Sequence, residues 1–412
     1  MRHRGIWLAG LAAAVTWLCV APARAEDEAP SDPTRGHWDT FLDPVRDGED
    51  KITDAQKSFE DRTKIHVGAG IAYQWWHNFD LPPTKLNTLH SLDPYHDTAS
   101  FNLGQLSVSR PSQGWFIPGF GLKLDAGKVA ERIKPDYNGN GVVAPGDPFE
   151  NNSFDVQELY GTWAVPEDSP ALKGLSVKGG KFVTLLGAEV IEPWANFNVS
   201  RSFLFGYAIP FTHTGGLVSY PFTDKLAMTI GPVVGWDTVK ESNNRPTGLG
   251  NLTYLATDEL TLSANGTYGP EQAHNDHAKR GIIDLVATVK PAALPDLTLL
   301  LNYDWGHEDD VVDGTRPGIW QGFAAVANYN FTPRCSGAFR GEWFADTDGV
   351  RTGTPQTLWE LTFTTRYLIT QHAILRFEYR HDGSTERVFP ANETGAWSGQ
   401  DIAGFEFTYL FS

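Results

Sequence analysis

Charged side chains of both signs recur at alternate positions in three segments near the C-terminal end of the chain. In 372–380, apolar residues occupy the odd-numbered positions, while the even-numbered ones include Arg376, Glu378 and Arg380. Because successive side chains of a β-strand point to opposite faces, these charges would share one face. Segments 333–346 and 356–369 repeat the alternation. The charged face then comprises Arg340, Glu342, Glu360, Arg366, Arg376, Glu378 and Arg380.

Arginines interleaved with glutamates on adjacent strands predict a wall of fixed charge. Adjacent strands lie about 4.8 Å apart, so these groups could form a continuous ladder. Such a wall around a narrow aqueous passage would select among ions and polar solutes, because a solute that sheds water feels fixed charge strongly. The alternative is that the charges pair with one another, as in any water-filled lumen, and select nothing.

The alternation extends far beyond these three segments. In 296–305, for example, Leu297, Leu299 and Leu301 oppose mostly polar neighbours. Many segments run about 10–12 residues, the length of a tilted transmembrane strand and about twice that of an ordinary strand. Aromatic residues gather at segment ends, as interfacial girdles require: Trp75, Trp76, Trp115, Trp163, Trp236, Trp305 and Trp343. The last segment is also aromatic, although Ser412 follows Phe411 at the end.

Short and long connections alternate strictly between the predicted strands, which is characteristic of outer-membrane barrels. The sequence therefore predicts an all-β fold, a transmembrane antiparallel β-barrel of about 16 strands (range 14–18), with short periplasmic turns and long external loops. A barrel of that size leaves an aqueous channel. The expected strands are 65–76, 99–110, 115–126, 154–165, 173–184, 213–222, 224–238, 247–256, 258–268, 279–290, 295–306, 317–330, 333–346, 356–369, 371–381 and 399–411.

The N-terminus indicates export. Arg2 and Arg4 precede an apolar run, and Ala23-Arg24-Ala25 resembles a cleavage site, so 1–25 is predicted to be a signal peptide. Residues 26–64 are expected to form a periplasmic segment, either a solvated extension or partly a helix that oligomerises or faces peptidoglycan. Residues 65–412 are then the barrel domain.

The chain is acidic, with a net charge of −17. Cleavage of the predicted signal peptide would remove three arginines and no acidic residue, leaving a net charge of about −20. Without a basic tract, this composition argues against a nucleic-acid partner. It could mildly favour cations at a pore mouth, but net charge says little about a lumen.

The connection 185–212 is far more apolar than the other long loops. Because Trp194, Phe197 and Phe203 would be costly to leave in water, we expect this loop to fold into the lumen. There it would direct polar side chains at the channel: Glu189, Glu192, Asn196, Asn198 and Arg201. The alternative is one more strand hairpin, which would raise the count to eighteen strands.

The same region carries a family resemblance. The stretches Lys181-Phe182, Gly187-Ala188-Glu189, Asn196-Phe197-Asn198, Ser200-Arg201-Ser202 and Pro210-Phe211-Thr212-His213-Thr214-Gly215 resemble the central signature of the putative β-barrel porin-2, or OmpL-like, family. The resemblance is most specific over 178–216 and looser across 65–411. It implies an outer-membrane, porin-like barrel and specifies no substrate.

A loop at 136–147 has calcium-loop spacing. Asp136, Asn138, Asn140, Gly141 and Asp147 match positions 1, 3, 5, 6 and 12 of such a loop, with Asp in place of the usual Glu. No flanking helices are apparent, and runs of Asn, Asp and Gly are common in external loops. The alternatives are a Ca²⁺ site and an ordinary turn-rich loop; no other cofactor is expected.

Catalysis finds little support in the sequence. His213 lies near Ser200 and Ser202, but neighbours of this kind arise by chance among 12 histidines. We therefore predict a porin in the outer membrane of a Gram-negative bacterium, surrounded by lipid, that passes small hydrophilic solutes or ions passively. A homo-oligomer is suggested only by analogy with other porins of this size. The alternatives are a substrate-specific uptake channel, a non-conducting structural or adhesive barrel, and a soluble secreted sandwich.

Overall fold

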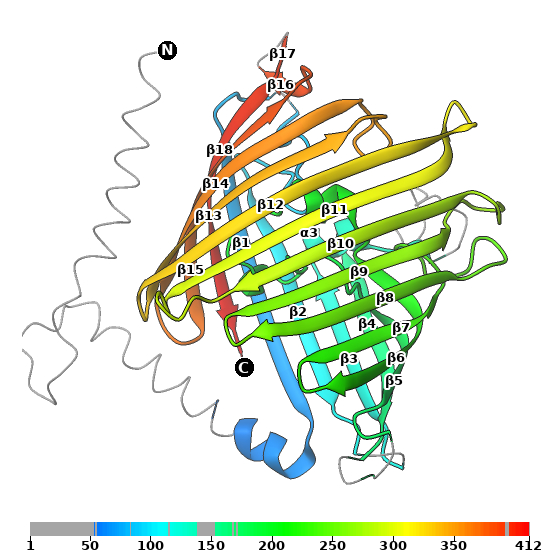
Figure 1. Cartoon of the computed structure of the whole chain (residues 1–412). Helices are drawn as coiled ribbons and strands as arrows, with labels where there is room; N and C mark the ends of the chain where they lie inside the picture. Colours follow the sequence, from blue (N-terminus) through cyan, green and yellow to red (C-terminus); the bar gives the residue numbers. More distant parts are fainter. Residues whose placement is uncertain are drawn as a thin grey trace, which may run out of the picture.

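In the computed structural model, the chain forms a closed barrel of sixteen antiparallel strands (Figure 1). The structure describes residues 53, 56–82, 84–113, 116–137, 153–166, 169, 172–391 and 395–411. Each barrel strand pairs with its sequence neighbours, and β1 closes the ring against β18. The predicted fold class is thus confirmed.

The strand bounds lie close to the expected ones. The alternative of eighteen barrel strands is wrong, because β16 and β17 form a separate two-stranded sheet and the connection 184–211 adds no strand. The barrel strands are β1 (His66–Asn78), β2 (Ala99–Arg110), β3 (Gly119–Ala126), β4 (Phe154–Ala164), β5 (Ser176–Val183), β6 (Thr212–Thr223), β7 (Leu226–Val233), β8 (Thr247–Thr257), β9 (Leu260–Pro270), β10 (Lys279–Val289), β11 (Leu297–Val312), β12 (Arg316–Thr332), β13 (Cys335–Asp346), β14 (Gln356–Leu368), β15 (Ala373–Ser384) and β18 (Gly399–Leu410); the separate hairpin is β16 (Phe389–Ala391) with β17 (Gly395–Trp397).

The strand register separates an apolar outer face from a polar inner one. Phe363 and Trp359 on β14 are exposed on the outside, whereas Thr362 and Glu360 between them are fully buried inside. Glu360 lies opposite Glu342 of β13, and Thr362 opposite Arg380 of β15. The charged residues therefore share the inner face, as the alternation predicts. No helix in the described part of the chain is long and apolar enough to cross a bilayer.

The interior differs from a simple water-filled tube. An apolar cluster occupies the end of the barrel with the long loops, where inward residues such as Leu103, Leu249 and Phe344 pack against loop residues. The short helix α3 (Lys128–Ile133) contributes Val129 and Ile133 to this cluster. Part of the lumen is therefore filled by folded loop segments. The alternation of the strands could not reveal this, because it describes only the wall.

Residues 56–63 are helical and lie at the end of the barrel that carries the short turns (Figure 1). Gln56 donates from Nε2 to the carbonyl of Val67, 2.6 Å away at the start of β1. Thr53 Oγ1 lies 3.2 Å from Nε2 of His372, in the turn before β15. These contacts tie the segment to the rim of the barrel. The predicted signal peptide lies outside the described residues.

Candidate functional site: the lumen loop and its wall

Residues 184–211, called the lumen loop below, connect β5 to β6 and run inside the barrel. The loop contains a 3₁₀-helical turn, η1 (Pro193–Ala195), and a π-helical turn, η2 (Leu204–Ala208). Its apolar residues join the cluster inside the barrel, including Phe203, Phe205 and Ile209. Burying these large side chains explains why the segment leaves water for the interior.

Arg201 holds the lumen loop in shape from within. Its guanidinium, 4% exposed, donates hydrogen bonds to the carbonyls of Val190, Ile191 and Val199, each at 2.9 Å. Burial lowers the pKa of Arg201, against the opposing effect of the Glu189 carboxylate. Arg201 therefore binds loop backbone, whereas the sequence predicted that it would face the channel.

Arginines of the wall bind the carbonyl groups of the lumen loop. Arg376 of β15 donates to the carbonyls of Pro193, Asn196 and Asn198 at 2.9–3.1 Å. Arg380, two residues further along β15, donates to the carbonyl of Arg201 at 2.6 Å. Charge-assisted hydrogen bonds of this kind are about twice as strong as neutral ones. They fix the loop against β15.

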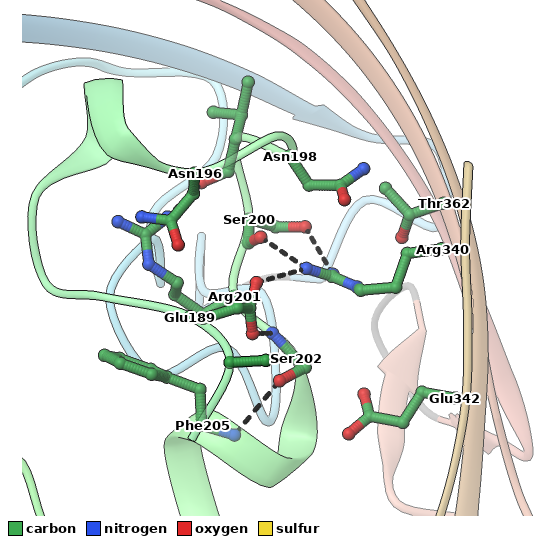
Figure 2. Close-up of polar contacts among 12 residues, drawn as sticks. Glu189, Asn196, Asn198, Ser200, Arg201, Ser202, Phe205, Arg340, Glu342 and Thr362 are labelled. Carbon is green, nitrogen blue, oxygen red and sulfur yellow. Dashed lines mark hydrogen bonds and ion pairs between the residues drawn. The ribbon is translucent and has the colours of Figure 1, made fainter. Parts of the chain in front are cut away.

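Arg340 of β13 occupies the centre of this contact. It donates to the carbonyl of Ser200 at 2.8 Å and to the Glu189 carboxylate at 2.8 Å, as Figure 2 shows. On the wall, its Nε donates to Glu360 at 2.6 Å. Its side chain has no exposed surface. The guanidinium thus links the strand to the loop and meets no solvent.

Glutamates of the wall accept hydrogen bonds from loop amide groups. Glu378 accepts from the backbone N–H of Val199 at 2.5 Å and of Ser200 at 2.9 Å. Glu342 accepts from the N–H groups of Phe203 and Leu204, each at 2.6 Å. Arginines on carbonyls and glutamates on amides together bind the backbone of the loop between Pro193 and Leu204, which needs such partners once it is buried.

The charged wall residues therefore face inward as predicted, but the lumen loop covers most of them. Arg376 and Arg380 are 1% exposed and Glu378 is 3% exposed. Asn198 donates to Thr364 of the wall at 2.7 Å, and Asn196 bonds within the loop. Arg366 alone among the predicted wall residues faces inward without a contact to the loop or an ion pair to any described residue.

Glu192 marks the opposite edge of the lumen loop. Its carboxylate lies 2.7 Å from Nζ of Lys123 on β3, which also pairs with Glu158 of β4 at 3.1 Å. Burial alone would raise the pKa of Glu192, but the Lys123 ammonium outweighs it and holds that pKa below its usual value. The side chain of Lys123 is 28% exposed, so water reaches this edge of the loop.

The beginning of the lumen loop is held by a third part of the wall. Gly187 donates its backbone N–H to Asp284 of β10 at 3.1 Å, and Ala188 donates to Asn302 of β11 at 3.1 Å. We did not predict Lys123, Asp284 or Asn302 as site residues. Their inward parity was visible in the sequence, but nothing there showed which part of the wall the loop would reach.

The remaining candidate sites gain no support from the geometry. Asn138, Asn140, Gly141 and Asp147 of the calcium hypothesis lie outside the described residues, and within the described ranges no three His, Cys, Asp or Glu side chains converge to hold a metal ion. His213 contacts Thr184 at 3.1 Å and the carbonyl of Gly235 at 2.8 Å. The hydroxyl of Ser200 instead accepts a hydrogen bond from Arg340 at 3.1 Å.

Solved structures of outer-membrane proteins resemble this barrel. An anion-selective porin from Comamonas acidovorans matches with a TM-score of 0.52 at 10% identity, over 84% of this chain and 99% of its own. The channel DcaP of Acinetobacter baumannii gives 0.53 at 11% identity, over 84% and 96%. OprB of Pseudomonas putida gives 0.52 at 10%, over 84% and 94%. At these identities the likeness concerns the fold alone.

No curated protein matches the chain in sequence. A family model does, over residues 64–411, and its description is "Putative beta-barrel porin-2, OmpL-like". The match spans the whole barrel and includes the lumen loop with its anchoring strands. The chain therefore belongs to this family of porins and is a β-barrel of the Gram-negative outer membrane.

Proposed function

We propose that this porin passes small hydrophilic solutes and ions passively, and that the lumen loop sets the constriction. The observation that carries the proposal is the attachment of the loop to three separate parts of the inner wall: β13–β15, β3–β4 and β10–β11. A loop fixed in this way narrows a sixteen-strand barrel at a defined level without needing a cofactor or a chemical step.

The predicted constriction residues then divide into two roles. Arg340, Arg376 and Glu378 hold the lumen loop, because their charged groups are buried against its backbone. The Glu192–Lys123 edge meets the solute, since the lysine retains exposed surface. The wall charges thus act on passage mainly by fixing the position of the loop.

A substrate-selective channel is the second candidate. It is favoured because the lumen loop is itself covered by a second loop. The loop 79–98 folds over it, with Ser91 against Gly206: a Cβ at Gly206 would lie 2.8 Å from Oγ of Ser91. His90 of this loop lies between Asp93 at 2.7 Å and Asp382 of β15 at 3.0 Å. Burial alone would lower the pKa of His90, but the two carboxylates outweigh it and raise that pKa to about 9.

Single-channel conductance of the refolded protein in a planar bilayer tests both candidates. Steady openings that scale with salt concentration support passive diffusion through a permanent passage. Openings that are rare until a particular solute is added, and currents that saturate with that solute, support the selective channel. A correctly folded barrel, recognised by its heat-modifiable migration, that carries no current under any of these conditions would contradict the porin function.

We infer the remaining organisation from the sequence: residues 1–25 as a cleaved signal peptide and 26–64 as a periplasmic segment ahead of the barrel. The contacts of Thr53 and Gln56 with the barrel rim support a position at the periplasmic end. Self-association is also proposed. N-terminal sequencing of the exported protein and its mass in detergent by light scattering test these assignments.

A further inference from the structure

The acidic residues on the inner face of the barrel are all withdrawn from solvent. Twelve inward-facing Asp and Glu side chains occupy the described strands in regular register, and each of these residues is at most 6% exposed. Most of them pair with an arginine, lysine or histidine or accept hydrogen bonds from the lumen loop. They are Asp125, Asp155, Glu158, Asp284, Asp304, Glu308, Glu342, Asp346, Glu360, Glu378, Asp382 and Glu406.

Two inward-facing basic residues differ from these acids both in burial and in pairing. Lys178 of β5 and Arg366 of β14 are only partly buried, and neither forms an ion pair with any residue that the structure describes. The ammonium of Lys178 lies 4.4 Å from the ring centre of Tyr160, and Glu158, the carboxylate that acts on it electrostatically, is already paired with Lys123. Arg366 lies opposite Arg376, whose own charge is neutralised by Glu406.

The strand register confirms that both side chains face the lumen. Lys178 lies opposite Thr162 on β4, on the same face as Tyr160 and as the Lys123 ammonium that contacts the lumen loop. Arg366 shares its face with Thr364, to which the loop residue Asn198 donates. Both are the third residue from the short-turn end of their strand.

The two charges also face each other across the barrel. In the ring of sixteen strands, eight strands separate β5 from β14 on one side and six on the other. A solute between the lumen loop and the periplasmic opening therefore passes, at a similar level, two positive charges that form no ion pair with any described residue. The net charge of the chain, −17, does not determine the electrostatic potential on the solute at this level, because exposed charges beyond a Debye length of about 8 Å are largely screened.

We propose that Lys178 and Arg366 determine the charge specificity of the pore, and that they make its periplasmic half favour small anions such as chloride and simple carboxylates. This inference rests on the proposed function, since it needs a conducting lumen. The buried acids contribute less because each is covered by the wall or the loop and most are neutralised there. Lys178 and Arg366 are only partly buried, so a passing anion can approach their ammonium and guanidinium groups.

Reversal potential in a salt gradient tests the proposal. Lys178→Gln and Arg366→Gln should each lower the anion-to-cation permeability ratio by about threefold, as expected for one full charge a few ångströms from an ion in water. The double variant should lower it by about tenfold. Lys178→Arg and Arg366→Lys keep the charge and should keep the ratio. Lys225→Gln and Arg334→Gln, in exposed short turns, are matched controls that should leave it unchanged.

The outcomes separate the two proposals. A wild-type barrel that folds but carries no current refutes the porin function itself. A conducting pore whose permeability ratio is the same in the double variant as in the controls leaves the porin function standing and overturns the roles of Lys178 and Arg366. A ratio that falls in the glutamine variants and is kept in the charge-conserving ones supports the inference, because a folding defect would affect both sets.

Discussion

Replacing Glu378 with glutamine should loosen the lumen loop while leaving the barrel intact. The carboxylate accepts three hydrogen bonds: from the amide groups of Val199 and Ser200, and from the hydroxyl of Thr364 at 2.6 Å. A glutamine side chain offers one oxygen and one N–H₂ group at the same place. One of the two loop amides would then meet a donor and lose its partner.

The size of the effect follows from these bonds. A hydrogen bond to a charged group contributes about 1.5–3 kcal/mol, and a buried donor left without a partner costs about 1–3 kcal/mol. Because the two costs overlap, we expect the opening free energy of this part of the loop to fall by about 2–4 kcal/mol. At 1.4 kcal/mol per factor of ten, this is about a 30- to 700-fold loss of protection against hydrogen exchange.

Hydrogen exchange of the Val199 and Ser200 amides, followed by mass spectrometry on the protein in detergent, measures this loss. Glu308→Gln is a suitable control, because the hydrogen bonds and the ion pair of Glu308 are with Gln272 and with Arg280 on β10, outside the lumen loop. The change should be confined to the loop, with strand amides unaffected. Equal protection of residues 199 and 200 in wild type and Glu378→Gln would refute the claim that wall carboxylates hold the loop.

Three further predictions follow from the same contacts. Gly70→Val should displace the loop from β1 and increase current fluctuations, because a Cβ at Gly70 would lie 2.7 Å from Cη2 of Trp194, and overpacking of this kind costs about 1–3 kcal/mol. Trypsin cleavage within 79–98 should rise as pH increases through 9. The pKa of His90 is raised in the folded state, so the stability that the protonated imidazole contributes is complete below about pH 6.5 and is lost as the group deprotonates. His90→Gln should be cleaved readily at pH 7, and cleavage independent of pH in wild type would contradict the assignment. Lys123→Gln should shift the reversal potential toward cations, because it leaves the Glu192 carboxylate unpaired; an unchanged potential would remove this edge from the constriction.

Much of the fold could be predicted because the barrel wall obeys a local rule. Alternation of apolar and polar residues fixes which side chains face the lumen, so the inward position of Arg340, Glu360 and Arg376 was visible in the sequence. The sixteen strands and their short turns follow from the same pattern. The apolar composition of the lumen loop also indicated that it leaves water.

The partners of these inward residues could not be predicted. The sequence shows that Arg376 faces inward, but not that it binds the carbonyls of residues nearly two hundred positions away. The loop path depends on its own internal hydrogen bonds, such as those of Arg201, and on which wall groups it meets. For the same reason the sequence could not separate the covered charges from Lys178, which was not among the expected site residues.

The proposed function requires that the lumen loop border the path of the solute. Val190, 42% exposed within the loop, allows this to be measured with Val190→Cys, a small change at an exposed side chain of the loop. A charged, membrane-impermeant thiol reagent should lower the single-channel current of this variant in discrete steps and leave identically treated wild type unchanged. Complete modification of the variant thiol, established by mass spectrometry, with an unaltered current would contradict the account.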